Sequence, residues 1–175
     1  MKIMVTGSEG FICGYLVENL LDNGHQVVGI DNFSKYGEIK RSYANNLNYT
    51  FIEGDVCDTD LLTENLKDCD HLVASAAKIG GISYFHEYAY DLMAENERIM
   101  ASTFDAAIKA HKENKLQKIT VLSSSMVYEN TSKYPTPEGD ELLSPPPFST
   151  YGFQKLATEY FAKGAWEQYK LPFTI

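Results

Sequence analysis

Tyr151 and Lys155 lie four residues apart in a stretch that is predicted to be helical. Side chains with this spacing share one helix face, with Cβ atoms about 5–6 Å apart. A free tyrosine ionises near about pH 10, so its use as a base near neutral pH requires about 4 kcal/mol of stabilisation of the phenolate. One cation at about 4 Å supplies about 4 kcal/mol at an effective dielectric constant of about 20. The pair therefore indicates a tyrosine base that takes a proton from an alcohol.

Two further segments supply the other groups that are needed to oxidise such an alcohol. The serine run Ser123–Ser125 lies upstream of the tyrosine, and the glycine-rich segment Thr6–Ile12 near the start of the chain is typical of a phosphate loop. Each feature alone has an ordinary explanation. A Tyr-x-x-x-Lys spacing arises by chance in a chain with 12 tyrosines, and serine runs occur in loops at sheet edges. In this order, they predict hydride transfer between an alcohol carbon and a dinucleotide.

The glycine-rich segment follows a predicted strand and opens a predicted helix, which is the context that a dinucleotide motif requires. Gly7 permits the tight turn, and Gly10 lets backbone N–H groups approach a pyrophosphate, which the helix dipole favours. Compared with Gly-x-Gly-x-x-Gly, the first two glycines are one residue further apart. Cys13 stands at the third glycine position, and cysteine is the largest residue that we expect to fit there. The alternative is an ordinary strand–turn–helix.

Asp31 favours the dinucleotide interpretation. It ends the predicted strand Gln26–Ile30, where a carboxylate would accept hydrogen bonds from an adenosine ribose. The same carboxylate would repel a 2′-phosphate, and no arginine follows it closely in the sequence. Lys35 is near, but it lies in a loop and is expected to be solvated. We therefore predict NAD, rather than NADP, as the cofactor.

Composition limits the other functions. The chain has 175 residues, 44% of them hydrophobic, which is enough for one domain with a core. With 15 basic and 24 acidic residues its formal charge is −9, which argues against general binding to nucleic acid or anionic membranes. No apolar run approaches the roughly 18 residues of a membrane span, and the N-terminus does not resemble a signal peptide. Three cysteines without CxxC spacing and four scattered histidines predict a soluble, cytoplasmic protein without a metal site.

Apolar periodicity alternates between strand-like and helical stretches. The predicted strands are Lys2–Thr6, Gln26–Ile30, Tyr49–Glu53, His71–Ala76, Ile119–Leu122 and Leu171–Ile175. The predicted helices are Phe11–Leu21, Asp58–Leu66, Tyr88–His111 and Tyr151–Tyr169. The segment Pro135–Pro147 carries five prolines and is expected to be irregular. Alternation of this kind predicts a doubly wound α/β fold, in which a parallel sheet carries helices on both faces.

These segments together resemble the extended short-chain dehydrogenase/reductase family, and within it the NAD-dependent nucleotide-sugar epimerases and dehydratases. The matching pieces span the chain and are Thr6-Gly7-x-x-Gly10-Phe11-Ile12, Asp31-Asn32, Gly54-Asp55-Val56, Ser75-Ala76-Ala77-Lys78, Asn96, Ser123-Ser124-Ser125 and Tyr151-x-x-x-Lys155. The resemblance implies that residues 1–175 form a Rossmann domain that binds NAD.

The resemblance also implies a role for each matching residue. The catalytic residues would be Ser124, Tyr151 and Lys155, and the substrate would contact Ser124 and Ser125. The cofactor would contact Gly7, Gly10, Phe11, Ile12, Asp31, Asn32, Asp55, Val56, Ser75, Ala76, Ala77, Lys78, Asn96, Tyr151 and Lys155. In this scheme Asp55 and Val56 contact the adenine, and Asn96 helps to order the cofactor. Taken singly, Asp55 is also explained as a turn cap and Asn96 as a helix-surface amide.

The residues after the catalytic serine distinguish the sugar chemistries of the family. Dehydratases place acidic residues there, whereas this chain has Ser125-Met126. GDP-fucose synthases and GDP-mannose 3,5-epimerases carry a cysteine at the position of Met126, although the segment 76–82 resembles theirs most. Because a thioether cannot replace a thiolate, we favour epimerisation of a UDP-sugar at C4. A dehydratase, a reductase similar to GDP-fucose synthase and a non-catalytic NAD-binding module remain alternatives.

Members of the family continue past the sixth strand into a smaller substrate-binding domain. This chain ends at Ile175, within the predicted sixth strand, so the substrate domain is expected to be absent from it. The resemblance also implies a homodimer that pairs through the helix 88–111 and the helix bearing Tyr151. Met100, Phe104 and Phe161 are candidates for that face, and burial in the core explains them equally well.

Overall fold

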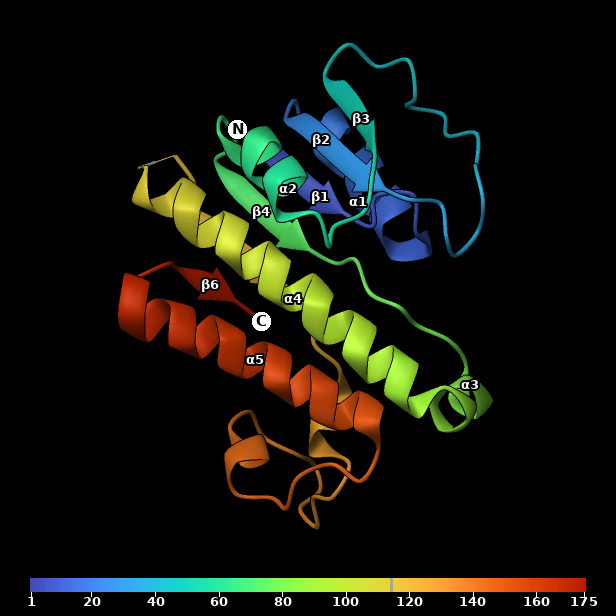
Figure 1. Ribbon diagram of the computed structural model, residues 1–175, viewed down its shortest axis with the longest axis vertical. Coiled ribbons are helices and arrows are strands. Elements are labelled where there is room, and N and C mark those ends of the chain that lie inside the picture. Colours follow the sequence, from blue (N-terminus) through green and yellow to red (C-terminus); the bar gives the residue numbers. More distant parts are fainter. Residues whose placement is uncertain (114) are drawn as a thin grey trace.

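Six parallel strands form the sheet of this protein, for which a computed structural model describes residues 1–113 and 115–175 (Figure 1). The strands are β1 Lys2–Thr6, β2 Gln26–Asp31, β3 Tyr49–Glu53, β4 His71–Ala74, β5 Lys118–Val121 and β6 Phe173–Thr174. Their spatial order is β3-β2-β1-β4-β5-β6. The chain moves outward from β1 to β3, returns to place β4 beside β1, and then moves outward the other way. Its direction therefore reverses between β1 and β4.

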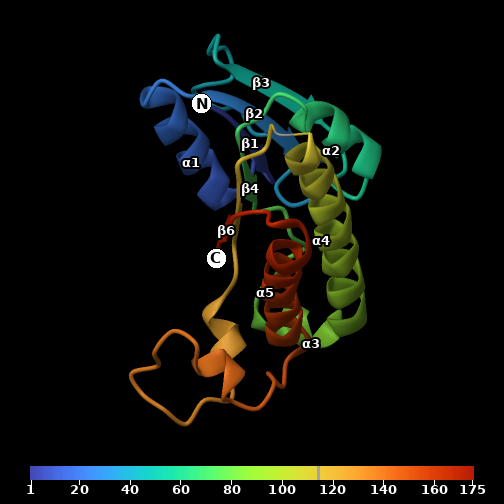
Figure 2. The ribbon, with the colours of Figure 1, turned by 90° about the vertical axis from the view of Figure 1, so that its left-hand side faces the viewer.

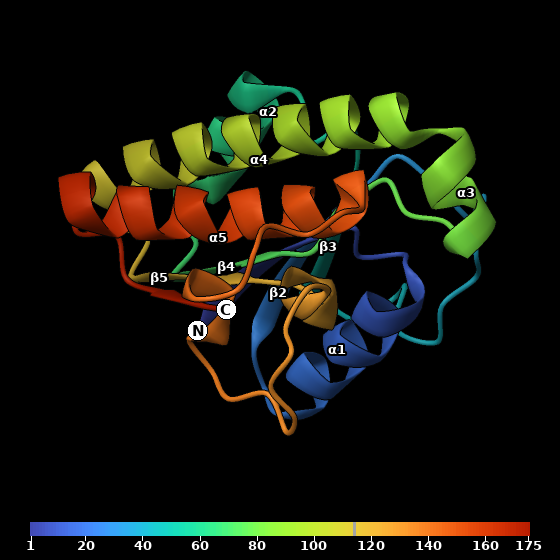
Figure 3. The same cartoon turned by 90° about the horizontal axis from the view of Figure 1, so that it is seen from below.

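Helices cover both faces of this sheet. They are α1 Phe11–Asp22, α2 Thr59–Leu66, α3 Ile82–Glu87, α4 Ala89–Lys112 and α5 Thr150–Tyr169. Figure 3 shows α1 on one face and α2, α4 and α5 on the other. The segment between β5 and α5, which contains two short 3-10 turns, extends away from the sheet (Figure 2). The predicted doubly wound Rossmann fold is confirmed.

Most predicted bounds agree with the structure to within one residue, and three differences have a local reason. The fourth strand ends two residues early because the N–H groups of Ser75 and Ala76 donate to Thr6 Oγ1 instead of to a neighbouring strand. The sixth strand begins only after Pro172, which has no N–H to donate. The helix predicted over 88–111 is preceded by a separate helix, α3, and the two meet at Tyr88, where φ is −116° and ψ is 36°.

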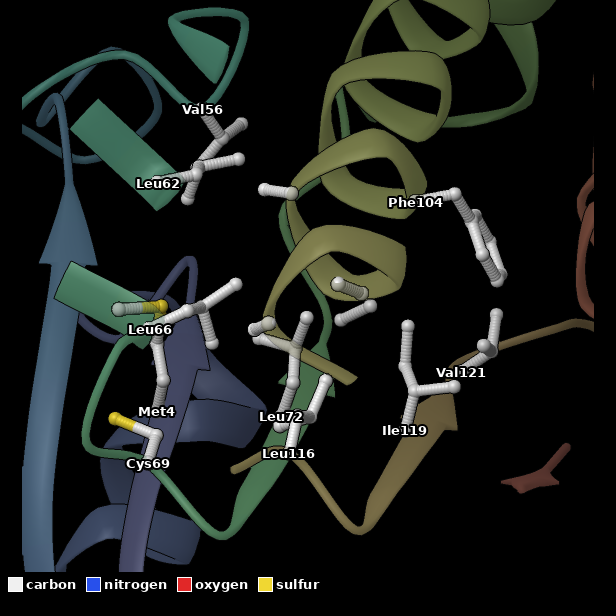
Figure 4. Packing of buried hydrophobic residues seen from close by; sticks show 14 of the residues in the cluster. Met4, Val56, Leu62, Leu66, Cys69, Leu72, Phe104, Leu116, Ile119 and Val121 are labelled. Carbon is white, nitrogen blue, oxygen red and sulfur yellow. The ribbon is translucent and has the colours of Figure 1, made fainter. Parts of the chain in front are cut away.

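Alternate residues of β1 pack into the two halves of the core, one on each face of the sheet. Met4 joins the larger cluster, which lies between the sheet and the helices α2, α4 and α5. Ile3 and Val5 join the smaller cluster under α1. Figure 4 shows the larger cluster, with Leu62 and Leu66 of α2 and Phe104 of α4 facing the sheet. The alternation follows from the two-residue period of a strand, and it makes β1 the element on which both layers pack.

The two longest helices, α4 and α5, run side by side (Figures 1 and 3). Phe104 and Phe161 stack between them with ring centroids 5.7 Å apart, and Met100 is buried in the same cluster. Of the two explanations for these residues, burial inside the chain is therefore the one that the structure supports. Within residues 1–113 and 115–175, no helix is both long enough and apolar enough to cross a membrane.

Candidate active site

The carboxyl ends of the central strands gather the predicted site residues at one edge of the sheet. Gly7 follows β1, Asp31 ends β2, Ser75 follows β4 and Ser123 follows β5. In an open parallel sheet, ligands bind outside the carboxyl ends of the strands, at the point where the strand order reverses. Here that point lies between β1 and β4.

The glycine loop passes tightly over the start of the β4 loop. Gly7 has φ +70°, and its N–H donates to Ile30 O at 2.8 Å. A Cβ added at Gly7 would stand 3.0 Å from Ala76 Cα, so a side chain would push these two loops apart. This position requires glycine both for its backbone conformation and for the close approach.

The N-terminus of α1 is open for an anion. Gly10 is its N-cap and offers no side-chain hydrogen bond, and the first intrahelical bond runs from Gly14 N–H to Gly10 O at 2.9 Å. The N–H groups of Phe11 and Ile12 precede that bond and point out of the helix end, while the side chains of both residues are exposed. Free amides at the positive end of a helix, beside a glycine cradle, fit the pyrophosphate of a dinucleotide.

Asp31 lies directly beside this loop. Its Oδ2 accepts from Glu9 N–H at 3.1 Å, and its Oδ1 accepts from Phe33 N–H at 2.8 Å. The carboxylate remains partly exposed, so its other lone pairs can accept from ribose hydroxyls. Asn32 is exposed and accepts from the N–H of Ser34 in the same turn. Lys35 is exposed, as expected, and also donates to Ile79 O at 2.7 Å, so it is more than a solvated side chain.

Asp55 and Val56, the predicted adenine contacts, differ in environment. Asp55 is exposed, and its Oδ1 accepts from Cys57 N–H at 2.8 Å in a turn. Val56 is buried, and its side chain packs in the core beside Leu62 (Figure 4). Asp55 is therefore the member of the pair whose side chain is open to a ligand, and the adenine contact stays a prediction.

Asn96 holds the loop after β4 from the opposite side. Its side chain is only 1% exposed, so it is not a helix-surface amide. Nδ2 donates to Lys78 O at 2.9 Å, and Oδ1 accepts from Lys78 N–H at 2.7 Å. The segment 75–78 is thus fixed by Thr6 at one end and by Asn96 at the other. Asn96 acts on any bound ligand through this loop.

Tyr151 and Lys155 lie on the buried side of α5. Ser149 caps this helix by accepting from Gly152 N–H at 3.0 Å. The ring of Tyr151 stacks on Phe85 of α3, with centroids 4.4 Å apart and planes inclined by 6°. Lys155, 8% exposed, donates from Nζ to Leu122 O at 2.9 Å, directly after β5. Burial lowers the pKa of Lys155 from its ordinary 10.5 to about 8, so the ammonium holds its proton weakly.

The serine turn meets the start of α5. Ser124 Oγ accepts from Met126 N–H at 3.2 Å and caps the 3-10 turn Ser125–Tyr128, while Ser125 is exposed. A Cβ at Gly152 would stand 2.7 Å from Met126 O, so this glycine allows the turn to approach the residue next to Tyr151. The structure therefore brings all three predicted catalytic residues to the same part of the edge.

Sequence reasoning missed three contributors to this edge. Phe85 is one, and Glu159 is the second: its buried carboxylate accepts from Ser123 Oγ at 2.6 Å. Glu159 is four residues after Lys155, so helical spacing places it on the same face and was an available signal. The third is Arg41, which binds Glu9 of the glycine loop at 3.1 Å. It comes from a loop without periodicity, which leaves no sequence signal for the contact.

Elsewhere, a shallow hollow lies at the amino ends of the strands, and none of the predicted residues lines it. Its walls are Met1, Lys2, Gly24, Gln26, Asn48, Asp68 and Asp70. Across the described part of the chain, no group of three or more His, Cys, Asp or Glu side chains is placed to hold a metal ion. The predicted site residues therefore lie at the carboxyl edge and not in this hollow.

Known proteins are similar to this chain in sequence and in fold. The model of the NAD dependent epimerase/dehydratase family matches residues 3–175. A protein of Methanocaldococcus jannaschii is 34% identical over 173 residues, which cover 92% of this chain and 50% of that protein. The chain is similar in structure to the UDP-N-acetylglucosamine 4-epimerase of Methanobrevibacter ruminantium, with a TM-score of 0.84, 30% identity, and coverage of 98% of this chain and 52% of the epimerase.

A second solved structure is the UDP-glucuronic acid 4-epimerase of Bacillus cereus, in complex with UDP-glucuronic acid and NAD. Its TM-score is 0.82 at 29% identity, over 100% of this chain and 55% of the epimerase. The chain thus spans about half the length of the curated relatives and solved structures that it matches.

The buried ammonium of Lys155 predicts a pH-dependent stability. Between about pH 8 and 10.5 the unfolded chain binds more protons at this site than the folded chain, so the stability of the wild type rises with pH there. Lys155→Met removes the group. The difference between its free energy of unfolding and that of wild type is expected to favour the variant most at or below pH 8. By pH 10.5 this difference is expected to fall by about 3 kcal/mol.

Urea unfolding of both proteins at several pH values measures this difference. Lys67→Met, which changes an exposed lysine, is the matched control and is expected to show a constant difference from wild type. A constant difference for Lys155→Met as well would contradict the assignment of a destabilised ammonium.

Proposed function

The chain belongs to the NAD-dependent epimerase/dehydratase family, and from that premise we propose that residues 1–175 are the NAD-binding, catalytic half of a nucleotide-sugar 4-epimerase that acts on a UDP-sugar. One observation supports this most strongly. Buried Lys155 reaches the carbonyl after β5, one helical turn from Tyr151, at the same sheet edge as the open glycine loop. The similar solved structures include UDP-sugar 4-epimerases, one of them with NAD.

The cofactor is assigned to the carboxyl edge. In this proposal the free amides of Phe11 and Ile12 bind the pyrophosphate, and Asp31 accepts from the adenosine ribose. Asp55 lies toward the adenine, and the segment 75–78 lines the cleft. Lys155 binds the nicotinamide ribose. When bound, NAD supplies the acceptor for a hydride from the sugar carbon.

The protein's own part in the reaction is proton transfer and orientation. Tyr151 Oη takes the proton from the C4 hydroxyl of the sugar and returns it after the keto sugar has rotated in the site. Ser124 Oγ holds the same oxygen, and the Lys155 ammonium stabilises the Tyr151 phenolate. The Phe85 ring, stacked on Tyr151, limits its movement during these steps.

The cysteines support epimerisation at C4 over chemistry that needs a thiolate. Cys13 and Cys69 are buried, and burial raises the pKa of Cys69 to about 11. Burial together with Asp55 raises the pKa of Cys57 to about 11. The position two residues before Tyr128 is Met126, which cannot act as acid or base. Oxidation, rotation and re-reduction at C4 require none of these groups.

We also propose that the protein works in the cytoplasm as a homodimer. Met100, Phe104 and Phe161 are used within the chain, so the dimer face would draw on other residues of α4 and α5, such as the exposed aromatic rings Tyr160 and Trp166. Light scattering during gel filtration is expected to give twice the 19.7 kDa chain mass. A mass of one chain at micromolar concentration would contradict the dimer.

Turnover tests the reaction directly. The protein, together with any sequence that follows Ile175 in its natural chain, is incubated with catalytic NAD⁺ and a panel of UDP-, GDP-, CDP- and dTDP-sugars, and the products are followed by mass and proton NMR. We expect a UDP-sugar product of unchanged mass with a new anomeric signal. Loss of water would instead identify a dehydratase, and consumption of added NADH a reductase. NAD binding without turnover would favour a non-catalytic module.

Tyr151→Phe separates catalysis from binding in the same assay. It is expected to keep NAD binding and to lose at least about 90% of turnover, because the proton acceptor is gone. Tyr160→Phe is the matched control, since Tyr160 is on the same helix but 57% exposed, and is expected to turn over normally. More than about a tenth of wild-type turnover in Tyr151→Phe would exclude the proposed base.

A further inference from the structure

A carboxylate is buried inside the glycine loop. Glu9, 6% exposed, stands between the two glycines of the motif. Its Oε2 accepts from Arg41 Nε at 3.1 Å, and its Oε1 accepts from the Tyr49 hydroxyl at 2.9 Å. Arg41 Nη2 also donates to the backbone carbonyls of Glu9 and Gly10. One arginine thus joins the loop 32–48 to the phosphate loop by a salt bridge and two carbonyl contacts.

Two glycines make room for this cluster. A Cβ at Gly14 would stand 2.5 Å from Arg41 Nη1, and a Cβ at Gly29 would overlap the hydroxyl of Tyr49. The guanidinium therefore lies against the helix in a space where a side chain would otherwise stand. This explains why the dinucleotide motif of this chain has a glycine just after Cys13.

The guanidinium also lies close to the carboxylate assigned to the ribose. Glu9 accepts from Arg41 through its carbonyl and donates through its N–H to Asp31 Oδ2 at 3.1 Å. A single residue therefore separates Arg41 from Asp31. The sequence places Arg41 ten positions beyond Asp31, which hides this proximity.

An arginine near the adenosine ribose is the group that binds a 2′-phosphate. Its planar donors match phosphate oxygens in pairs. Here Nε and Nη2 donate to Glu9 and two carbonyls, and Glu9 is the one carboxylate paired with Arg41 among residues 1–113 and 115–175. The nearby phenols offer no substitute charge, because burial raises the pKa of Tyr43 to about 12 and also raises that of Tyr49.

We propose that Glu9 is a positioning residue that sets the choice of coenzyme. Glu9 holds Arg41 against the phosphate loop, so this arginine is not available to bind a 2′-phosphate. Asp31 repels NADP, and Glu9 keeps the nearest cation from compensating. Removal of the Glu9 charge leaves a buried guanidinium without a paired negative charge, and a 2′-phosphate then becomes its favoured counterion. This inference rests on the NAD site of the proposed function.

Four proteins test it by calorimetric titration with NAD⁺ and with NADP⁺: wild type, Glu9→Gln, Arg41→Met and the double variant. Glu9→Gln keeps the shape of the side chain and removes its charge. It is expected to bind NADP⁺ at least about tenfold more tightly than wild type does, with a much smaller change for NAD⁺. The double variant is expected to lose that gain, because the released arginine is absent.

Arg41→Met alone provides a check that does not depend on Glu9→Gln folding. Because Arg41 is held away from the ligand in wild type, its loss is expected to leave the ratio of the two affinities unchanged. A selective loss of NADP⁺ binding in Arg41→Met would contradict the proposal, as would an unchanged ratio in folded Glu9→Gln. A gain that persists in the double variant would also overturn it, since the Glu9 charge alone would then explain the effect.

The wild-type titration separates this inference from the proposed function. Failure of wild type to bind NAD⁺ would overturn the coenzyme site itself, and with it the role of Glu9. Binding of NAD⁺ by wild type, with a ratio that does not respond to Glu9→Gln, would overturn only the role of Glu9.

Discussion

The hydroxyl of Thr6 accepts from the N–H groups of Ser75 and Ala76 at 3.0 Å each, and the carboxyl edge of the sheet depends on this contact. It ends β4 early and ties the loop after β4 to the end of β1, where the strand order reverses. Gly7 then crosses the same loop so closely that a Cβ would meet Ala76. The junction between these two neighbouring strands is thus fixed by one short hydroxyl and by backbone groups, and it does not rely on long side chains.

Around that crevice, buried polar side chains hold each loop in turn. Asn96 fixes the segment after β4, Glu159 fixes Ser123 after β5, and Glu9 with Arg41 fixes the loop after β2. Each has its partners within the protein, as buried polar groups require. Lys155 differs, because its contact is a neutral carbonyl and burial opposes its charge. A buried lysine whose charge weakens the fold is what the proposed catalytic role would explain.

The sequence was sufficient to predict the fold and most of the residues that gather at the carboxyl edge of the sheet. Periodicity located all six strands because each is a short apolar run beside turn residues, and the Tyr151–Lys155 spacing identified one face of α5. The contacts that it could not supply join distant segments without periodicity. Arg41 and Glu9 are 32 residues apart, and Phe85 meets Tyr151 only because α3 separates from α4 at Tyr88. The contacts of Glu9 with Arg41 and Tyr49 likewise arise only when these segments pack together in the fold.

The central claim is that the carboxyl edge of this chain is a preformed site for NAD. Amide resonances of the ¹⁵N-labelled protein, followed during titration with NAD⁺, test it most directly. The account predicts saturable shifts in the glycine loop, the end of β2, the segment 75–78 and the residues around Lys155, with the amides of Phe11 and Ile12 moving most. Absence of shifts, or shifts centred on the amino-edge hollow at Met1, Gly24 and Asp70, would contradict it.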